Sequence, residues 1–572
     1  MATDSQKIND VSYQLLAYEP IHETSLDVDI QNIIMGVQDN TKEVYEQALV
    51  NFLVKESKEF DILELNKENK REKLWDALLK ILIANPEKSA LLADVFTVFR
   101  IVSRDKSSVN KLVTDEWIGL VLMHIGLNDR DYGYDEVTLC KIEEAHKVLW
   151  NVLFNSREQV EATVTNSLLE KLVNRIKTYD KAPVPDSIKF YDMKIIFLIS
   201  ALSINVRQKL EDELNGFICF LNVLRVILRE AAENLAQSDL LPAILDDQKA
   251  EISCETLKAL FNITLNCSSD DDSLAKYNEL VRVLRDYLLA STASIEKTWQ
   301  LRNDIVNLLT NIPSECYREL LTLVDSSVTV PKVLCFEGLN MIVIYEILMF
   351  LKAKFSDETG VSKQLEVYSP VLTVLLKGAT THRPIRKFLR LHILPPLKDV
   401  DKRPEETDTL RGYLCKMLTT PITQVRDLVA ELLFVLCKCN VSRMIKYTGY
   451  GNAAGLFAQR GLLGGRKDNA EADYSSSSED SETEEYAEQK HLINPVLGCL
   501  EQPHEDPMAG MTDEQKEYEA MKLVQLMDSL TRSGAIKPCR VGADGKPHVI
   551  EHILELQQGL KIREAADDSD TD

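Results

Sequence analysis

Two pairs of arginines have the type and spacing needed to bind an anion. Arg100 and Arg104 are four residues apart, and so are Arg386 and Arg390. Residues at this spacing lie on one face of a helix, and a guanidinium binds a carboxylate through parallel hydrogen bonds. Each pair could therefore hold a carboxylate such as the C-terminus of a partner protein. A solvated helix face with intramolecular ion pairs would give the same pattern, and both interpretations stay open here.

Asparagine recurs near the ends of predicted helices, at Asn151, Asn262, Asn307 and Asn311. Its amide both donates and accepts, which suits the backbone of a bound peptide or helix. Asn also satisfies local backbone groups where a helix ends, and for any single Asn that is the favoured explanation. Because the residue recurs in equivalent places, we expect the group to line a binding groove.

The sequence contains no pattern typical of catalysis or of a metal site. Nine histidines are dispersed, and eleven cysteines include no C-x-x-C pair. The glycine-bearing segment GYGNAAG lacks the G-K-[ST] ending of a phosphate-binding loop and does not have dinucleotide-binding spacing. We therefore expect no catalytic residue, no metal and no cofactor, and a protein that acts by binding.

The elements that must position these residues are predicted to be helices. Between residues 425 and 436, apolar residues recur three and four apart along one stripe. A related phrase recurs along the chain as FRIVSRD, LWNVLFN, FLISALS, FNITLNC and FVLCKCN. Such a recurrence is typical of armadillo or HEAT repeats, which stack into a superhelix with a concave groove. We expect an all-α armadillo/HEAT-type helical-repeat superhelix over residues 41–466, after an N-terminal lead-in of residues 1–40.

The charge is negative and uneven. The net charge is −24, and residues 471–572 hold 24 acids and 9 bases. An acidic chain lacks the basic face that phosphates need, so nucleic acid is an improbable partner. The apolar runs are too short to span a bilayer. We expect a cytoplasmic protein without an integral membrane span.

The C-terminal part is predicted to be a flexible acidic tail that carries short helices. Residues 441–466 would close the solenoid as two helices joined by a glycine turn, with an exposed apolar face. Residues 467–510 read as an acidic linker, and residues 564–572 as a disordered tail. Within residues 511–563, Thr512 and Gln515 form a predicted capping box, and Gly534 ends the helix that follows. This helical segment would dock on another protein or on the solenoid.

The acidic linker contains candidate phosphorylation sites. Ser476, Ser477 and Ser481 each have an acid three residues on, and Thr483 is followed by two acids. Ser478 gains such a neighbour once Ser481 is phosphorylated. This is the pattern that a kinase of the casein kinase 2 type recognises.

Several unusual segments occur together in a known order. They are FRIVSRD, FYDMKIIFLISAL, LKALFNIT, HRPIRKFL with LPPLKDV, FVLCKCNVSRMIKYTGYGNAAG and MTDEQKEYEAMKLV. On these segments, over roughly residues 90–540, the chain resembles the synembryn family. The resemblance implies an exchange factor and folding chaperone for heterotrimeric G-protein α subunits, taken up without βγ. The alternative is a repeat adaptor that binds peptides or helices without affecting nucleotide exchange.

The resemblance also implies roles for individual residues. Arg100, Arg104 and Asn151 match the pocket for the C-terminal helix of the α subunit, Arg386 matches a further basic contact, and Arg390 stands where the family has Lys. Asn262 is added from the repeat argument. The segment of residues 441–463 resembles a docking site for neuronal calcium sensor proteins, with the candidates Met444, Ile445, Tyr447, Tyr450, Leu456 and Phe457. Casein kinase 2 would modify the acidic loop, and the protein would be recruited to the cell cortex.

Overall fold

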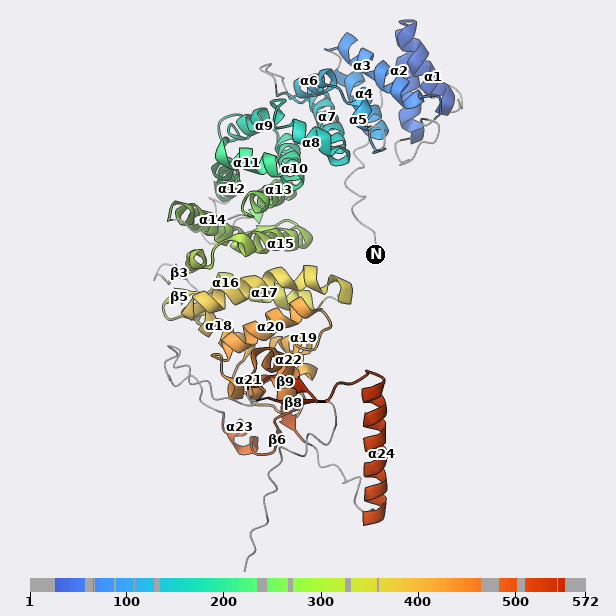
Figure 1. Cartoon of the computed structure of the whole chain (residues 1–572). Helices are drawn as coiled ribbons and strands as arrows, with labels where there is room; N and C mark the ends of the chain where they lie inside the picture. The colour runs from blue at the N-terminus through green and yellow to red at the C-terminus, as the bar shows by residue number, and fades with distance from the viewer. Residues whose placement is uncertain are drawn as a thin grey trace, which may run out of the picture. The chain divides into compact units, whose positions relative to one another are not determined.

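The chain forms two compact units of helices (Figure 1). The structure is a computed structural model that describes residues 26–56, 65, 67–86, 89–106, 109–127, 134–233, 244–265, 271–324, 331–356, 360–463, 483–501, 510–542 and 544–550. Unit 1 comprises residues 1–266 and 290–304, and unit 2 comprises residues 267–289 and 305–572. The predicted all-α, helical-repeat class is confirmed.

The helices of unit 1 follow one another along the chain. They are α1 (Leu26–Gln38), α2 (Lys42–Glu56), α3 (Lys70–Ala84), α4 (Ser89–Val102), α5 (Val109–Leu112), α6 (Asp115–His124), α7 (Glu136–Asn155), α8 (Arg157–Ala162), α9 (Leu168–Ile176), α10 (Asp186–Leu202), α11 (Ile204–Asp212), α12 (Gly216–Glu233) and α13 (Asp247–Ile263). A short parallel pair joins β1 (Ile244–Leu245) to β2 (Ser291–Thr292). The next helix, α15 (Ile295–Asn311), belongs to unit 1 up to Asp304.

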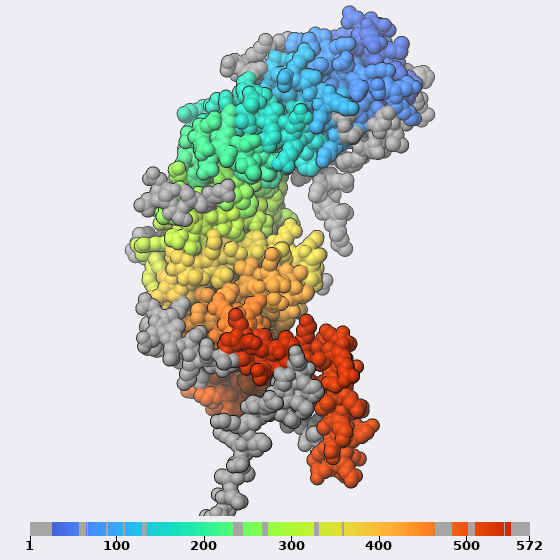
Figure 2. All heavy atoms as spheres, in the orientation of Figure 1, coloured from blue at the N-terminus to red at the C-terminus, as the bar shows by residue number. Residues whose placement is uncertain are grey.

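Four helices of unit 1 form a consecutive row, which we call the inner helices. Helix α4 packs on α7, α7 on α10, and α10 on α13. In Figure 2 the successive segments of this unit, coloured from blue to green, lie against one another in chain order. On α7, Val148, Leu149 and Val152 are fully buried, because residues three and four apart share the face that packs on its neighbours. Other residues of these helices are only partly buried, among them Arg100 on α4, Lys147 on α7 and Lys194 on α10.

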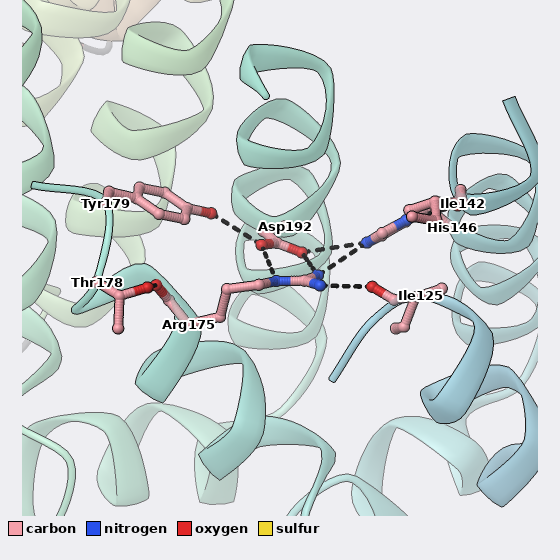
Figure 3. Close-up of polar contacts among 7 residues, drawn as sticks. All are labelled: Ile125, Ile142, His146, Arg175, Thr178, Tyr179 and Asp192. Carbon is pink, nitrogen blue, oxygen red and sulfur yellow. Dashed lines mark hydrogen bonds and ion pairs between the residues drawn. The ribbon is translucent and has the colours of Figure 1, made fainter. Parts of the chain in front are cut away.

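A buried polar network joins three helices of unit 1, namely α7, α9 and α10 (Figure 3). The carboxylate of Asp192 on α10 accepts hydrogen bonds from Arg175 Nε and from the Tyr179 hydroxyl, each at 2.8 Å. Arg175 Nη2 also contacts Asp192, and Arg175 Nη1 donates to the Ile125 carbonyl at the end of α6. His146 Nε2 on α7 lies 3.2 Å from Asp192. The network therefore fixes α7, α9 and α10 against one another.

Electrostatics explain why Asp192 can be charged although it is fully buried. Burial alone would raise the pKa of Asp192, but Arg175 and His146 outweigh burial and lower it. A buried carboxylate is tolerated only when it is paired and hydrogen-bonded, as here. The carboxylate and its partners act as one structural element.

Unit 2 contains α14 and the chain from residue 305. Its elements up to the glycine turn are α14 (Asp271–Leu289), η3 (Ser314–Leu320), β3 (Thr322–Leu323), η4 (Lys332–Leu334), β4 (Cys335–Phe336), β5 (Leu339–Asn340), α16 (Ile342–Ser356), η5 (Val361–Lys363), α17 (Gln364–Thr381), α18 (Arg383–Ile393), η6 (Pro404–Glu406), α19 (Leu410–Met417), α20 (Thr423–Leu436) and α21 (Val441–Thr448). Strand β5 lies between β3 and β4 in a small antiparallel sheet. The predicted stripe falls on α20, where Val425, Val429 and Leu433 are fully buried.

After the glycine turn the chain folds back on unit 2. The remaining elements are α22 (Tyr450–Arg460), α23 (Glu484–Gln489), β6 (Ile493–Asn494), β7 (Cys499–Leu500), α24 (Asp513–Arg532), β8 (Cys539–Val541) and β9 (Pro547–Val549). The β6–β7 hairpin is hydrogen-bonded to α22 through Gly451 N and Val496 O at 3.0 Å, and Leu500 N donates to Val400 O at 2.8 Å. Residues 483–501 of the predicted acidic linker are therefore folded.

Two local predictions are confirmed in this region. Gly449 separates α21 from α22 with φ of +74°, and a Cβ there would lie 2.9 Å from Val496 O, so the turn requires glycine. Thr512 and Gln515 form the capping box of α24. None of the side chains of α24 is buried, and Tyr518 is 66% exposed.

Among the described residues, no helix is long and apolar enough to cross a membrane.

Candidate functional site

Side chains on the part-exposed faces of the inner helices, together with the buried side chains of Glu144 and Asn262, are joined by contacts into one continuous band. We call this band the strip, and its members are Arg100 and Arg104 on and just after α4; Glu144, Lys147, Trp150, Asn151 and Phe154 on α7; Phe190, Tyr191, Lys194 and Phe197 on α10; and Lys258 and Asn262 on α13. Arg100 pairs with Glu144, Lys194 lies 5.3 Å from the Trp150 ring, and Lys258 lies 5.5 Å from the Phe197 ring. Each contact connects one helix to the next.

The arginine pair at the α4 end of the strip is positively charged in a half-buried setting. Arg100 Nε donates to Glu144 at 2.8 Å, and Lys147 Nζ donates to the other oxygen of that carboxylate at 2.7 Å. Burial raises the pKa of Glu144, but Arg100 and Lys147 outweigh burial and lower it, so Glu144 is ionised. The pKa of Arg104 is lowered by its burial and by repulsion from Arg100.

This charge balance favours an anion. Glu144 is paired with two cations, Arg100 and Lys147, and Arg104 lies close enough to Arg100 to be repelled by it. A further carboxylate nearby, Asp94, has its pKa raised to about 6 by burial and by Glu144. An incoming carboxylate would relieve the repulsion between the two guanidiniums and gain charge-assisted hydrogen bonds. The intramolecular ion-pair interpretation holds for Arg100, which shares Glu144 with Lys147.

The predicted asparagines join repeats to one another. Asn151 Nδ2 donates to the Arg100 carbonyl at 3.1 Å, and Asn262 Nδ2 donates to the Phe197 carbonyl at 3.1 Å and to Ser200 Oγ at 3.0 Å. Each amide thus binds a carbonyl in the C-terminal half of the preceding inner helix. The donor side of both amides is used within the protein, and it holds the strip in register.

Arg386 and Arg390 belong to unit 2, whereas the other four predicted contacts belong to unit 1. Arg386 Nη1 donates to the Ala379 carbonyl at 2.9 Å, at the end of α17. Arg390 is 8% exposed. Burial raises the pKa of the nearby Cys437 thiol to about 12, and the Arg390 charge opposes that rise. The predicted contacts therefore form two sets, one in unit 1 and one in unit 2, and each set is described within its own unit.

The prediction that residues 441–466 present an exposed apolar face is wrong. Met444, Tyr447, Leu456 and Phe457 are buried, at 0%, 7%, 5% and 0% exposure. Ile445 and Tyr450 are half-buried. The apolar periodicity was that of a packed helix pair, because α21 and α22 pack on each other and on α19 and α20.

The candidate phosphorylation sites Ser476, Ser477, Ser478 and Ser481 lie outside the described residues. Thr483 is described, and it is the N-cap of α23. Its hydroxyl accepts a hydrogen bond from Tyr486 N at 3.2 Å and donates to the Leu397 carbonyl at 2.5 Å. This side chain thus anchors the returning chain to unit 2.

Sequence reasoning missed Glu144, Lys194, Trp150 and Phe154. The signal that could have found two of them, Trp150 and Phe154, is the recurring phrase itself. In LWNVLFN, FLISALS and FNITLNC the closing helix carries an aromatic residue near its end, and Phe154 and Phe197 fall on the strip. Glu144 and Lys194 lie on the same face, one to two turns earlier in their helices. Within the described residues, no group of three or more His, Cys, Asp or Glu side chains could hold a metal ion.

Comparison with known proteins places the chain in one family. The family model described as guanine nucleotide exchange factor synembryn matches residues 95–546. The chain is 37% identical to a protein named Chaperone Ric-8A from Danio rerio, over 95% of this chain and 100% of that protein. It is 36% identical to Chaperone Ric-8A from Gallus gallus, over 92% and 97% of the two chains. It is 39% identical to Chaperone Ric-8 from Drosophila melanogaster, over 73% and 75%. The chain therefore belongs to the synembryn, or Ric-8, family of guanine nucleotide exchange factors and chaperones.

Proposed function

We propose that this protein is an exchange factor and folding chaperone for heterotrimeric G-protein α subunits, and that the strip captures the C-terminal helix of the α subunit. The observation that carries the proposal is the Arg100–Arg104 pair, whose mutual repulsion and half-burial favour a carboxylate ligand. The free C-terminus of a chain is such a ligand. Family membership supports the class of activity.

The strip suits a helix that carries both apolar and charged side chains. Aromatic rings alternate along it with the ammonium groups of Lys147, Lys194 and Lys258. Rings offer apolar contact, and the cations draw in an acidic segment. A rigid row of helices also keeps these groups in place, so little ordering is needed when the partner binds.

Exchange would follow from linkage and needs no bond chemistry. If the protein binds the nucleotide-free α subunit more tightly than the nucleotide-bound form, then each ligand weakens the other by the same factor. GDP release is then promoted, the empty state is stabilised against unfolding, and GTP binding ends the complex. Arg386 and Arg390 in unit 2 and the exposed helix α24 are proposed further contacts with the same partner.

Regulation is proposed at the acidic loop. Casein kinase 2 would modify Ser476, Ser477, Ser478, Ser481 or Thr483. Of these, Thr483 would have to give up its hydrogen bond to Leu397 when phosphorylated. A calcium sensor would reach Met444 or Phe457 only if the packing of α21 and α22 opens, because both side chains are fully buried. Recruitment to the cell cortex would then follow the partner.

The test is GDP release from a purified α subunit, with and without this protein. We expect faster release, and a stable complex by size-exclusion chromatography when no nucleotide is added. If a peptide with the C-terminal sequence of the partner binds but GDP release does not change, the adaptor function is supported instead.

A further inference from the structure

The small three-stranded sheet of unit 2 carries a row of apolar side chains on one face. Leu323 on β3 and Phe336 on β4 both lie opposite Leu339 on β5, and residues directly opposite in an antiparallel pair share a face. Leu323 is 81% exposed, and Phe336 and Leu339 are half-buried. Val333, on the η4 turn that leads into β4, is 70% exposed. Exposed apolar side chains gathered on one small sheet are typical of a binding surface.

A basic face of α18 lies beside this sheet. Arg383, Lys387 and Leu391 follow one another at intervals of four residues, so they share a face of the helix, and Leu391 is 48% exposed. Glu337, in the turn between β4 and β5, lies 3.4 Å from Arg383 Nη1 and 3.2 Å from Lys387 Nζ. These two ion pairs join α18 to the sheet, and β5 and α18 can be seen next to each other in Figure 1.

The charge of this surface is positive, although the whole chain carries −24. One carboxylate, Glu337, serves two cations, Arg383 and Lys387, and the exposed Lys332 adds a third cation on η4. Exposed charges act over about 8 Å at physiological ionic strength, so the distant acids of the chain do not cancel this local excess. We call the combined surface the sheet patch, and its members are Leu323, Lys332, Val333, Phe336, Leu339, Arg383, Lys387 and Leu391.

We propose that the sheet patch is a contact site for a lipid surface that carries anionic headgroups. Leu323 and Val333 would enter the boundary between headgroups and acyl chains, while the cations stay at the level of the headgroups. Charge complementarity argues for this occupant, because anionic headgroups attract Lys and Arg close to a membrane surface. The inference does not depend on the proposed exchange activity, and it supplies a route to the membrane that needs no protein partner.

The mixture of side chains in the sheet patch favours a lipid surface over a folded partner. A protein interface has a packed apolar core that is depleted in charge and is surrounded by a polar rim. In the sheet patch Lys332 is adjacent to Val333 in the chain, and Lys387 is one turn of α18 from Leu391. Long basic side chains between apolar ones suit a membrane interface, where each reaches up to the headgroups while its neighbours point into the acyl region.

The experiment measures co-sedimentation of the full chain, without an α subunit, with vesicles of phosphatidylcholine and phosphatidylserine in equal parts and with vesicles of phosphatidylcholine alone. We expect wild type to bind the anionic vesicles and to be released as the salt concentration rises, because salt screens the cations. Leu323→Ser with Val333→Ser should lower the partition coefficient about tenfold. Lys332→Gln with Arg383→Gln should lower it roughly twentyfold, because each cation near an anionic surface contributes about fivefold.

Matched control residues lie in unit 1. Ile204 and Ile295 are 60% and 66% exposed, so Ile204→Ser with Ile295→Ser removes a similar amount of exposed apolar side chain and should bind vesicles like wild type. Circular dichroism and thermal melts check that every variant is folded.

Two results would overturn the inference: no binding of wild type to the anionic vesicles, or equal binding by wild type and the variant that carries Leu323→Ser and Val333→Ser. If that variant keeps vesicle binding but loses a complex with a protein, the sheet patch belongs to a protein partner and the lipid assignment is wrong. Because no α subunit is present in the assay, its failure is distinct from failure of the proposed exchange activity.

Discussion

Replacing Asp192 tests whether the buried network holds the inner helices in place. Asp192→Ala leaves Arg175 in the interior without its carboxylate, and it removes the acceptor of the Tyr179 hydroxyl. Breaking a buried ion pair in this way costs about 3–5 kcal/mol. Asp192→Asn keeps the shape and part of the hydrogen bonding, so we expect about 2 kcal/mol. The control is Asp186→Asn on the same helix, which removes an i,i+3 surface pair with Lys189 worth under about 1 kcal/mol.

Hydrogen exchange is the appropriate assay, because a chain with two units has no single unfolding free energy. Amides of α7, α9 and α10 should exchange about two to four orders of magnitude faster in Asp192→Ala. Amides of α20 in unit 2 should be unchanged. The pKa of Asp192 is lower in the folded protein than in the unfolded chain. The ionised carboxylate therefore stabilises the fold fully at any pH above the pKa of the unfolded chain. This stabilisation is lost as the pH falls through the pKa of the folded protein. The contribution of Asp192 to wild-type protection should therefore be constant from pH 8 to pH 5. Unchanged exchange in Asp192→Ala would refute the reasoning.

Two further predictions concern charged groups in unit 1. Arg100→Ala with Arg104→Ala should weaken peptide capture by about 3 kcal/mol, or roughly a hundredfold, measured by calorimetry, with Arg282→Ala of unit 2 as an exposed control that changes nothing. Burial raises the pKa of Asp304 to about 6 in the folded protein, above its value in the unfolded chain. The protonated carboxyl group therefore stabilises the fold at low pH. This stabilisation is lost as the pH rises towards 6. Asp304→Asn should therefore stabilise unit 1 by about 1–2 kcal/mol at pH 7.5 and flatten its stability between pH 4 and 6; a destabilised variant in thermal melts would contradict this.

The fold class could be predicted because helical periodicity is a local property. The stripe on α20, the capping box at Thr512 and the turn at Gly449 are each decided by residues within a few positions of one another. The same periodicity could not say which apolar faces are exposed. Met444 and Phe457 are buried where α21 and α22 pack on each other and on α19 and α20, and no local signal marks that packing.

The candidate site was predicted in part for the same reason. Arg100 and Arg104 share a face by spacing alone, so the pair was visible in the sequence. Glu144 lies 44 residues beyond Arg100, and only the packing of α7 on α4 brings the two together. The asparagines were identified, but their donors serve the neighbouring repeat, which depends on how the inner helices stack.

We propose that the protein promotes GDP release from an α subunit by capturing the C-terminal end of that subunit on the strip. The most direct test compares GDP release from an intact α subunit with release from one that lacks its last few residues. We predict that the protein accelerates release from the intact form and has little effect on the truncated one, and that Arg100→Ala with Arg104→Ala reproduces the loss. Equal acceleration of both forms would contradict capture at this site.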